Sequence, residues 1–269
     1  MSDAFAQVVD DLGAEHAALR TVLESVPFAA WEKDTHAPGW AIRDQVTHLA
    51  YFDETAMTAI ADSEKFVADA AKMNSQVSTG GDPAYLVEAR TRPAPEILAW
   101  WQDASARLVE AARGLDASRR MPWYGPPMAA TSFVTARLME CWSHGLDVVD
   151  VAGVTREATD RLRHVAFLGV RTRNFSYVTR GLEPNTEAMR VELLAPSGEL
   201  WVFGELDAEN SVKGPAIDFC QVVTQRRNVA DTELAVSGEA AAEWMRYAQA
   251  FAGPPGAGRK PGQFPKAHP

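Results

Sequence analysis

Residues 133–153 read FVTARLMECWSHGLDVVDVAG, and this stretch decides the fold. Its apolar residues lie almost all round the helix that their spacing predicts, and a helix of this kind is mostly buried among other elements. Gly153 is expected to end the helix, and Thr131 or Ser132 to cap its start. The stretch therefore predicts one buried helix of a helical domain.

Three further helical segments precede this stretch. Apolar residues recur at helical spacing over residues 1–25, over residues 41–66, and in a third block that is interrupted near Pro93 and Pro95 and ends at Gly114. The break SQVSTGGDP at 75–83 and the loop MPWYGPPMAATS at 121–132 separate them; the prolines of that loop forbid regular structure. Four helices joined by loops predict an all-α bundle over residues 1–153.

The second half of the chain has a mixed pattern. A helical segment over 157–181 is followed by a hairpin over 189–206, whose turn is Pro-Ser-Gly. Two more helices are expected near 215–225 and 239–251, with a strand within 232–238 between them. We therefore expect a mainly α protein: a four-helix bundle, a small α+β domain over 154–252, and a Pro/Gly-rich, partly ordered tail over 253–269.

The composition excludes several classes of function. The chain has 269 residues, with 26 basic and 36 acidic side chains and a formal charge of −10. Because it contains no run of Lys or Arg, nucleic acid and anionic membranes are not expected partners. No apolar stretch reaches the about 18 residues of a membrane span, and no signal peptide is expected. We expect a cytoplasmic protein that acts on a small molecule, as a monomer or a homodimer.

The pattern with the clearest chemistry is Glu140-Cys-Trp-Ser-His144. Residues four apart share one face of a helix, so this carboxylate and this imidazole can bind the same cation. By itself such a pair also occurs as a solvated surface pair or as a hydrogen-bonded core histidine. In a mostly buried helix, however, both groups need partners, because an unpaired buried charge is costly.

His48, in the middle of the second helix, supplies a third candidate ligand. A lone histidine beside apolar residues also fits core packing with one hydrogen bond. If the second and fourth helices meet in an antiparallel bundle, His48 joins Glu140 and His144 in the core. Two histidines and one glutamate with an open position form a catalytic zinc pattern, and two histidines with a carboxylate also suit non-haem Fe(II).

The segments GWAIRDQVTHL (39–49) and RLMECWSHGLDVVDVAG (137–153) resemble the DinB-like metal-binding bundle. The similarity is greatest to mycothiol-dependent maleylpyruvate isomerases and to related actinobacterial metal-binding proteins of unassigned function. In those isomerases a histidine of the second helix and a Glu-x-x-x-His pair of the fourth hold the metal. The resemblance implies that His48, Glu140 and His144 bind a divalent ion, with zinc expected and nickel or iron as alternatives.

The resemblance also implies a chemistry. A thiol bound to the ion is deprotonated near neutral pH, and the thiolate adds to electrophiles. We therefore expect a metal-dependent enzyme of the thiol S-transferase or isomerase type, with mycothiol or a similar thiol as cosubstrate. Two alternatives stay open: a metal-dependent hydrolase, lyase or isomerase that uses no thiol, and a non-catalytic protein that binds a metal or a small molecule.

Other residues are candidates for supporting roles. Asp147, three residues after His144, is expected to orient an imidazole or to touch the substrate. Trp40, Trp123 and Tyr124 are candidates for the wall of a cofactor pocket, although aromatic residues in Pro-rich loops often serve only as anchors.

The second domain offers arginines and one of the two cysteines. The related isomerases use an arginine of their second domain near the metal, and Arg171 or Arg226 is the candidate here. Arginines near helix ends are also commonly solvated. Cys141 and Cys220 have no histidine placed to activate them, so both are expected to be small buried side chains.

Overall fold

The computed structural model describes residues 3–77 and 82–264, and the chain divides into two compact units, 1–156 and 157–269. Within the described ranges, none of the helices combines the length and the hydropathy needed to cross a bilayer.

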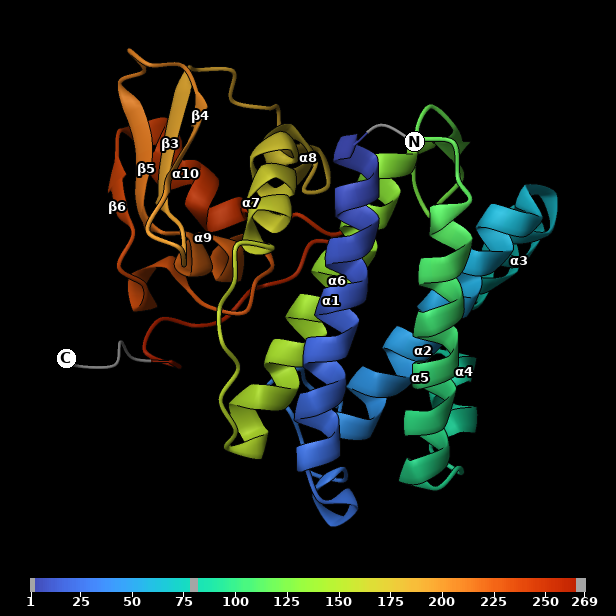
Figure 1. Ribbon diagram of the computed structural model, residues 1–269. Helices are drawn as coiled ribbons and strands as arrows, with labels where there is room; N and C mark the ends of the chain where they lie inside the picture. The colour runs from blue at the N-terminus through green and yellow to red at the C-terminus, as the bar shows by residue number, and fades with distance from the viewer. Residues whose placement is uncertain (1–2, 78–81, 265–269) are drawn as a thin grey trace. The chain divides into compact units, whose positions relative to one another are not determined.

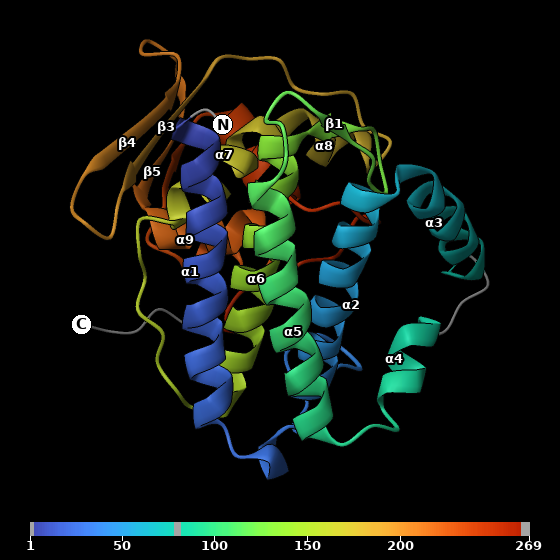
Figure 2. The same cartoon turned by 45° about the vertical axis from the view of Figure 1, so that its right-hand side comes forward.

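The first unit is the predicted four-helix bundle. Helices α1 and α2 each pack against both α5 and α6, while α3 and α4 lie beside α2 (Figure 2). Its elements are α1 (Asp3–Ser25), the 3-10 turn η1 (Phe28–Ala30), α2 (Ile42–Ala61), α3 (Ser63–Val77), α4 (Ala84–Ala89), α5 (Ala94–Arg113), β1 (Arg120–Met121), β2 (Met128–Ala129) and α6 (Ala130–Ala152). The mainly helical fold class is confirmed.

Large apolar side chains fill the bundle between these helices. Trp31, Trp101 and Ile42 have no exposed surface, and they belong to a core cluster that draws on α1, α2, α5 and α6. Gly153 ends α6 with a left-handed φ of 70°, a conformation that costs glycine little because it has no Cβ. This end of α6 is where the sequence predicts it.

Two helix boundaries differ from the prediction. The predicted helix over 41–66 is broken at Asp62, which leaves the helical conformation with φ −145°, and the Asp62 carboxylate accepts a hydrogen bond from the Lys65 N–H at 2.9 Å. The side chain thereby starts α3 as a new helix. At α6, neither Thr131 nor Ser132 is the cap, because the helix already begins at Ala130 and no side chain caps it.

The loops between the helices are more structured than predicted. The ends of the loop over 121–132 pair as a short antiparallel ladder, Arg120 with Ala129 and Met121 with Met128, so the exclusion of regular structure was wrong there. Of the predicted break at 75–83, residues 78–81 lie outside the described ranges. On either side of it the chain forms α3 and α4, and Pro93 immediately precedes α5.

The second unit is a small α+β structure. Its sheet has the order β4-β3-β5-β6, in which β3 runs antiparallel to β4 and parallel to β5, and helices α7, α9 and α10 pack on it (Figure 1). The elements are α7 (Leu162–Arg171), α8 (Arg173–Val178), β3 (Met189–Leu194), β4 (Leu200–Gly204), β5 (Asn210–Pro215), α9 (Ala216–Val223), the 3-10 turn η2 (Val229–Asp231), β6 (Ala235–Ser237) and α10 (Glu239–Tyr247).

The predicted hairpin is β3 and β4, and β6 lies within the predicted strand. The strand β5 was missed, because its sequence NSVKGP contains one large apolar residue and no clear alternation. The predicted helix over 157–181 divides at Thr172 into α7 and α8.

The described part of the Pro/Gly-rich tail is held by side chains. The Asp231 carboxylate accepts from the Gly262 N–H at 2.7 Å, and the Arg227 guanidinium lies 3.9 Å from the centroid of the Phe264 ring. The tail is thus ordered by these contacts up to residue 264, and residues 265–269 lie outside the described ranges.

Charged side chains are also buried inside the bundle. Arg137 of α6 donates to Asp53 of α2 through Nε at 3.2 Å and Nη2 at 2.8 Å, and both side chains are at most 3% exposed. On α1, Nε2 of His16 lies 3.9 Å from Oδ2 of Asp53. The helices therefore meet over a buried ion pair as well as over apolar side chains.

We predict that Asp53→Ala lowers the free energy of unfolding by about 3–5 kcal/mol, because it leaves the Arg137 guanidinium buried without its carboxylate. Urea denaturation measures the change. The control is Asp103→Ala, which removes one partner of the exposed Arg107–Asp103 pair and is expected to change stability by less than about 0.5 kcal/mol. Equal effects of the two substitutions would contradict the assignment of Asp53 to the core.

His16 makes the stability of the fold dependent on pH. Burial lowers the pKa of His16 below 6.5, and this effect exceeds that of the Asp53 charge, which raises it. As the pH falls below about 6.5, the unfolded chain takes up a proton that folded His16 does not, so the folded state loses stability.

We predict that His16→Phe removes this part of the pH dependence. The difference in unfolding free energy between the wild type and the variant should be constant above pH 7 and should shift in favour of the variant between pH 6.5 and 5. A difference that stays constant across the whole range would disprove the role of His16.

Candidate metal centre

Helices α2 and α6 bring the three predicted ligands together. His48 lies in the middle of α2, and Glu140 and His144 lie one turn apart on the face of α6 that packs against α2. One ligand atom from each of the three residues lies within 4.8 Å of the other two. Segments separated by more than 90 residues thus meet at one cluster of two imidazoles and one carboxylate.

The spacing of the donor atoms fits a small divalent ion. Glu140 Oε2 lies 3.2 Å from Nε2 of His48 and 3.2 Å from Nε2 of His144. Ligand atoms about 2.0–2.1 Å from a tetrahedral zinc ion lie about 3.3 Å from one another. The side chains of His48, Glu140 and His144 are 15%, 20% and 13% exposed, so the cluster is accessible from the surface.

The cluster also perturbs its own ionisation. Burial by itself would raise the pKa of Glu140, but hydrogen bonds to His144 and His48 outweigh it and hold that pKa well below its usual value. Burial, together with the neighbouring His144, lowers the pKa of His48 to about 4. At neutral pH the centre therefore presents an ionised carboxylate and, at His48, a neutral imidazole, which are the forms that bind metals.

The second ring nitrogen of each histidine also has a partner. Nδ1 of His48 lies 3.0 Å from the Tyr85 hydroxyl, and Nδ1 of His144 lies 2.6 Å from Oε1 of Gln45. Asp147 is buried, but its carboxylate lies 4.0 Å from Nδ1 of His144, so Gln45 and not Asp147 makes the short contact. Outer partners of this kind fix the orientation of a metal-binding ring.

Tyr85 reaches the cluster because an ion pair anchors the end of α4. Arg90 donates through Nε to Asp44 at 2.9 Å and through Nη2 to the Gly39 carbonyl at 3.0 Å. Asp44 in turn accepts from the Ala41 N–H at 2.9 Å, at the first turn of α2. The same carboxylate therefore caps α2 and holds α4 against it.

Aromatic rings surround the imidazoles. Trp40 lies 5.3 Å from His48 and 6.0 Å from His144 between ring centroids, and it is nearly parallel to the His144 ring. Phe52, one turn after His48 on α2, lies 4.5 Å from the His48 ring. These contacts place Trp40 beside the two imidazoles, and its role as the wall of a cofactor pocket remains a prediction.

Trp123 and Tyr124 stand one layer further out. Both lie between β1 and β2 and contact Phe52, at 6.2 Å and 5.5 Å between ring centroids. Trp123 also stacks on Phe66 of α3 at 5.5 Å, with an interplanar angle of 4°. The two residues thus support the ring that contacts His48, and direct contact with a bound molecule remains a prediction.

Arg171 and Arg226 belong to the second unit. The Arg171 guanidinium lies 5.6 Å from the centroid of the Phe167 ring, and Arg226 donates to the Thr224 carbonyl at 2.8 Å. Their expected role near the metal remains a prediction. Cys141 and Cys220 are buried free cysteines, as predicted, and burial raises the pKa of both thiols.

Sequence reasoning missed Gln45, Tyr85 and Phe52. Gln45 and Phe52 carry a weak signal, since they lie three residues before and four residues after His48 and so share its face of α2. Tyr85 carries none, because it follows the turn-rich break and reaches His48 only through the packing of α4.

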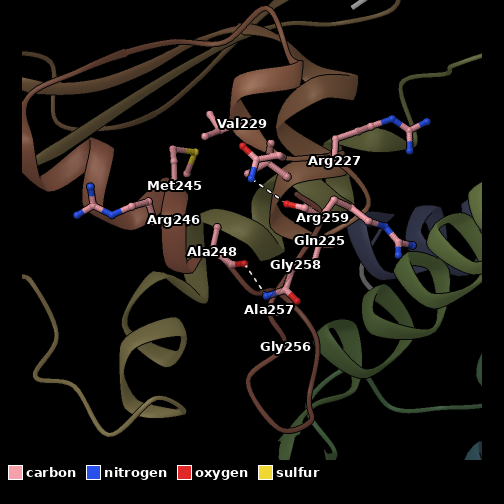
Figure 3. A pocket seen from close by; sticks show the side chains of 12 residues that line it. Gln225, Arg227, Val229, Met245, Arg246, Ala248, Gly256, Ala257, Gly258 and Arg259 are labelled. Carbon is pink, nitrogen blue, oxygen red and sulfur yellow. Dashed lines mark hydrogen bonds between the residues drawn. The ribbon is translucent and has the colours of Figure 1, made fainter. Parts of the chain in front are cut away.

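A pocket lies in the α+β unit, between α9, α10 and the tail. Arg227, Arg246 and Arg259 line its margin, but Figure 3 shows their guanidinium groups directed away from its centre. Inside it, side-chain amides bond to backbone: Asn228 donates to the Arg259 carbonyl at 2.8 Å and Gln225 to the Ala248 carbonyl at 3.2 Å. The Asn228 bond therefore holds the tail at Arg259, and the described residues that line this pocket include no group of metal-binding side chains.

Known proteins resemble this chain at two levels, a family of domains and individual relatives. Residues 12–149 match the family described as mycothiol maleylpyruvate isomerase N-terminal domain. Uncharacterized proteins of two Mycobacterium tuberculosis strains, CDC 1551 / Oshkosh and H37Rv, are each 43% identical over 251 residues, which cover 93% of this chain and 97% of theirs.

Two solved structures share the fold. The crystal structure of the mycothiol-dependent maleylpyruvate isomerase matches with a TM-score of 0.56 at 15% sequence identity. The match covers 83% of this chain and 90% of the isomerase chain. A mutant of that isomerase matches with a TM-score of 0.54 at 16% identity over the same shares.

Proposed function

The chain belongs to the mycothiol maleylpyruvate isomerase N-terminal domain family, and on that premise we propose that it is a divalent-metal-dependent enzyme. It uses His48, Glu140 and His144 to hold the ion, and it activates a low-molecular-weight thiol, mycothiol or a similar one. The thiol serves S-transfer or isomerisation of a small electrophilic metabolite. The observation that carries the proposal is the convergence of three donor atoms within 4.8 Å.

The donor set supports zinc as the ion, with nickel or iron as alternatives. Two imidazole nitrogens and one carboxylate oxygen are ligands that zinc accepts, and three protein ligands leave a position for an exogenous group. A cation bound there supplies one chemistry, the stabilisation of a thiolate at neutral pH. The proposed location is the cytoplasm, where low-molecular-weight thiols stay reduced.

The two reactions share a first step. The thiolate sulfur bonds to one carbon of a conjugated double bond, and the electron pair of that bond moves into the conjugated acceptor. For isomerisation, the resulting single bond rotates, the thiolate leaves, and the double bond returns with the opposite geometry. For S-transfer, a proton is added to the neighbouring carbon instead and the sulfur stays.

The residues around the ligands have distinct proposed roles. Trp40 covers the imidazoles and limits access of water, and Trp123 and Tyr124 shape the outer wall through Phe52. Asp147 stands beside the His144 ring as a buried acid. Arg171 or Arg226 grips the carboxylate of the substrate, for which a guanidinium is suited because it bonds in bidentate fashion.

We predict that the untagged protein contains about one equivalent of zinc, nickel or iron, and that His48→Ala/Glu140→Ala/His144→Ala contains none. Elemental analysis of both proteins measures this. The control is His36→Ala/Glu110→Ala, which removes a histidine and a glutamate outside the cluster and should keep the metal. Absence of metal from the wild type after reconstitution would contradict the proposal.

We predict that turnover of a conjugated electrophile such as maleylpyruvate requires both the metal and an added thiol. The assay compares the full-length protein with and without mycothiol, and Glu140→Ala should abolish activity while it keeps the fold. Equal turnover without thiol would favour a thiol-independent metalloenzyme. Tight ligand retention without turnover for any thiol–electrophile pair would favour a binding protein.

A further inference from the structure

A chain of hydrogen bonds joins the loop before α2 to the His144 ring. Gln45 Oε1 lies 2.6 Å from Nδ1 of His144, and Gln45 Nε2 donates to the Thr35 hydroxyl at 2.8 Å. The Thr35 hydroxyl donates to the Trp40 carbonyl at 2.8 Å. Gln45 is fully buried and Thr35 is 9% exposed, so water has little access to this chain.

The direction of the chain is set at the Trp40 carbonyl. A carbonyl only accepts, so the single hydroxyl proton of Thr35 is used on Trp40. Toward its other two neighbours, the Ala37 N–H at 3.3 Å and the Gln45 amide at 2.8 Å, that oxygen can therefore only accept. A hydroxyl whose only proton is already donated requires the NH2 group of Gln45, not its oxygen, to face Thr35.

The orientation of Gln45 then decides the protonation of His144. With its NH2 group on Thr35, the amide presents its oxygen to Nδ1, and an oxygen there accepts only if Nδ1 carries a proton. The other ring nitrogen, Nε2, is the one that points at Glu140 Oε2, 3.2 Å away. With the Nδ1 proton held by Gln45, Nε2 is the nitrogen that faces the ion, and a proton that Nε2 donates to Glu140 in the metal-free protein is the one that an ion would displace.

We propose that Gln45 is a positioning residue that, anchored by Thr35 and the Trp40 carbonyl, keeps the proton of His144 on Nδ1 and so assigns Nε2 as the metal-binding atom. The inference rests on the proposed metal site. Gln45 would fix the position of the proton on the His144 ring before any ion binds. Since Trp40 also lies over the His144 ring, the same loop residue covers the imidazole with its indole and orients it through its carbonyl.

Two measurements test the proposal. Nitrogen-15 NMR of the metal-free full-length protein should show Nδ1 of His144 protonated in the wild type. In Gln45→Leu this preference should be lost, and competition with a chelator should show zinc affinity reduced by about 10–100-fold. Gln45→Glu restores an oxygen acceptor and should keep zinc affinity within a few fold of the wild type, a rescue that a merely structural role would not give.

Two further variants complete the test. Thr35→Val removes the anchor and should weaken zinc binding by less than Gln45→Leu does, and Gln102→Leu, the same chemical change on α5, should leave both readouts unchanged. A wild-type His144 protonated on Nε2 alone, or equal zinc affinity of Gln45→Leu and the wild type, would overturn the proposal. If the wild type binds no metal, the proposed function fails, and the NMR measurement on the metal-free protein still decides the role of Gln45.

Discussion

The Glu140 carboxylate, held between two imidazoles inside a helical bundle, is the constraint on which the rest of this structure depends. Removing a carboxylate from water is unfavourable unless hydrogen bonds and opposite charge compensate. Here the compensation comes from α2 and from the next turn of α6, so these two helices must meet in one register. A bundle with the same apolar core in another register would leave the carboxylate without partners.

The same constraint explains the unusual pattern of α6. Arg137, Glu140, His144 and Asp147 follow one another at intervals of three, four and three residues, so they form one polar stripe on a mostly apolar helix. The first member pairs with Asp53, five residues after His48 on α2, and the next two join His48 in the proposed metal centre. The Arg137–Asp53 pair and the His48–Glu140 contact both join α2 to α6. Together they favour this alignment of the two helices over one in which α6 is shifted along α2.

The predictable and unpredictable parts of the site differ in whether helix geometry and helix packing alone place their residues. Glu140 and His144 were predictable because a helix alone sets their spacing, and His48 was predictable once two helices were expected to meet. Tyr85 was not, because its position depends on an ion pair between Arg90 and Asp44, residues 46 apart in sequence. The break at Asp62 was also missed, since the apolar period continues across it and only the Asp62 side chain, which accepts from the Lys65 N–H, marks the start of a new helix.

The position of Gln45 shows how the ligand set and the surrounding loop depend on each other. His48 and Gln45 lie on one face of α2, so the helix that supplies one ligand also supplies the residue that orients another, His144. Gln45 can act in this way only if Thr35 and Trp40 are in place, and these residues belong to a loop that packs back on α2 through the bridge between Asp34 and Ala41. The proposed ion-binding geometry therefore depends on helix and loop together: a bundle reduced to its helices would keep the three candidate ligands but lose the hydrogen bonds proposed to orient His144.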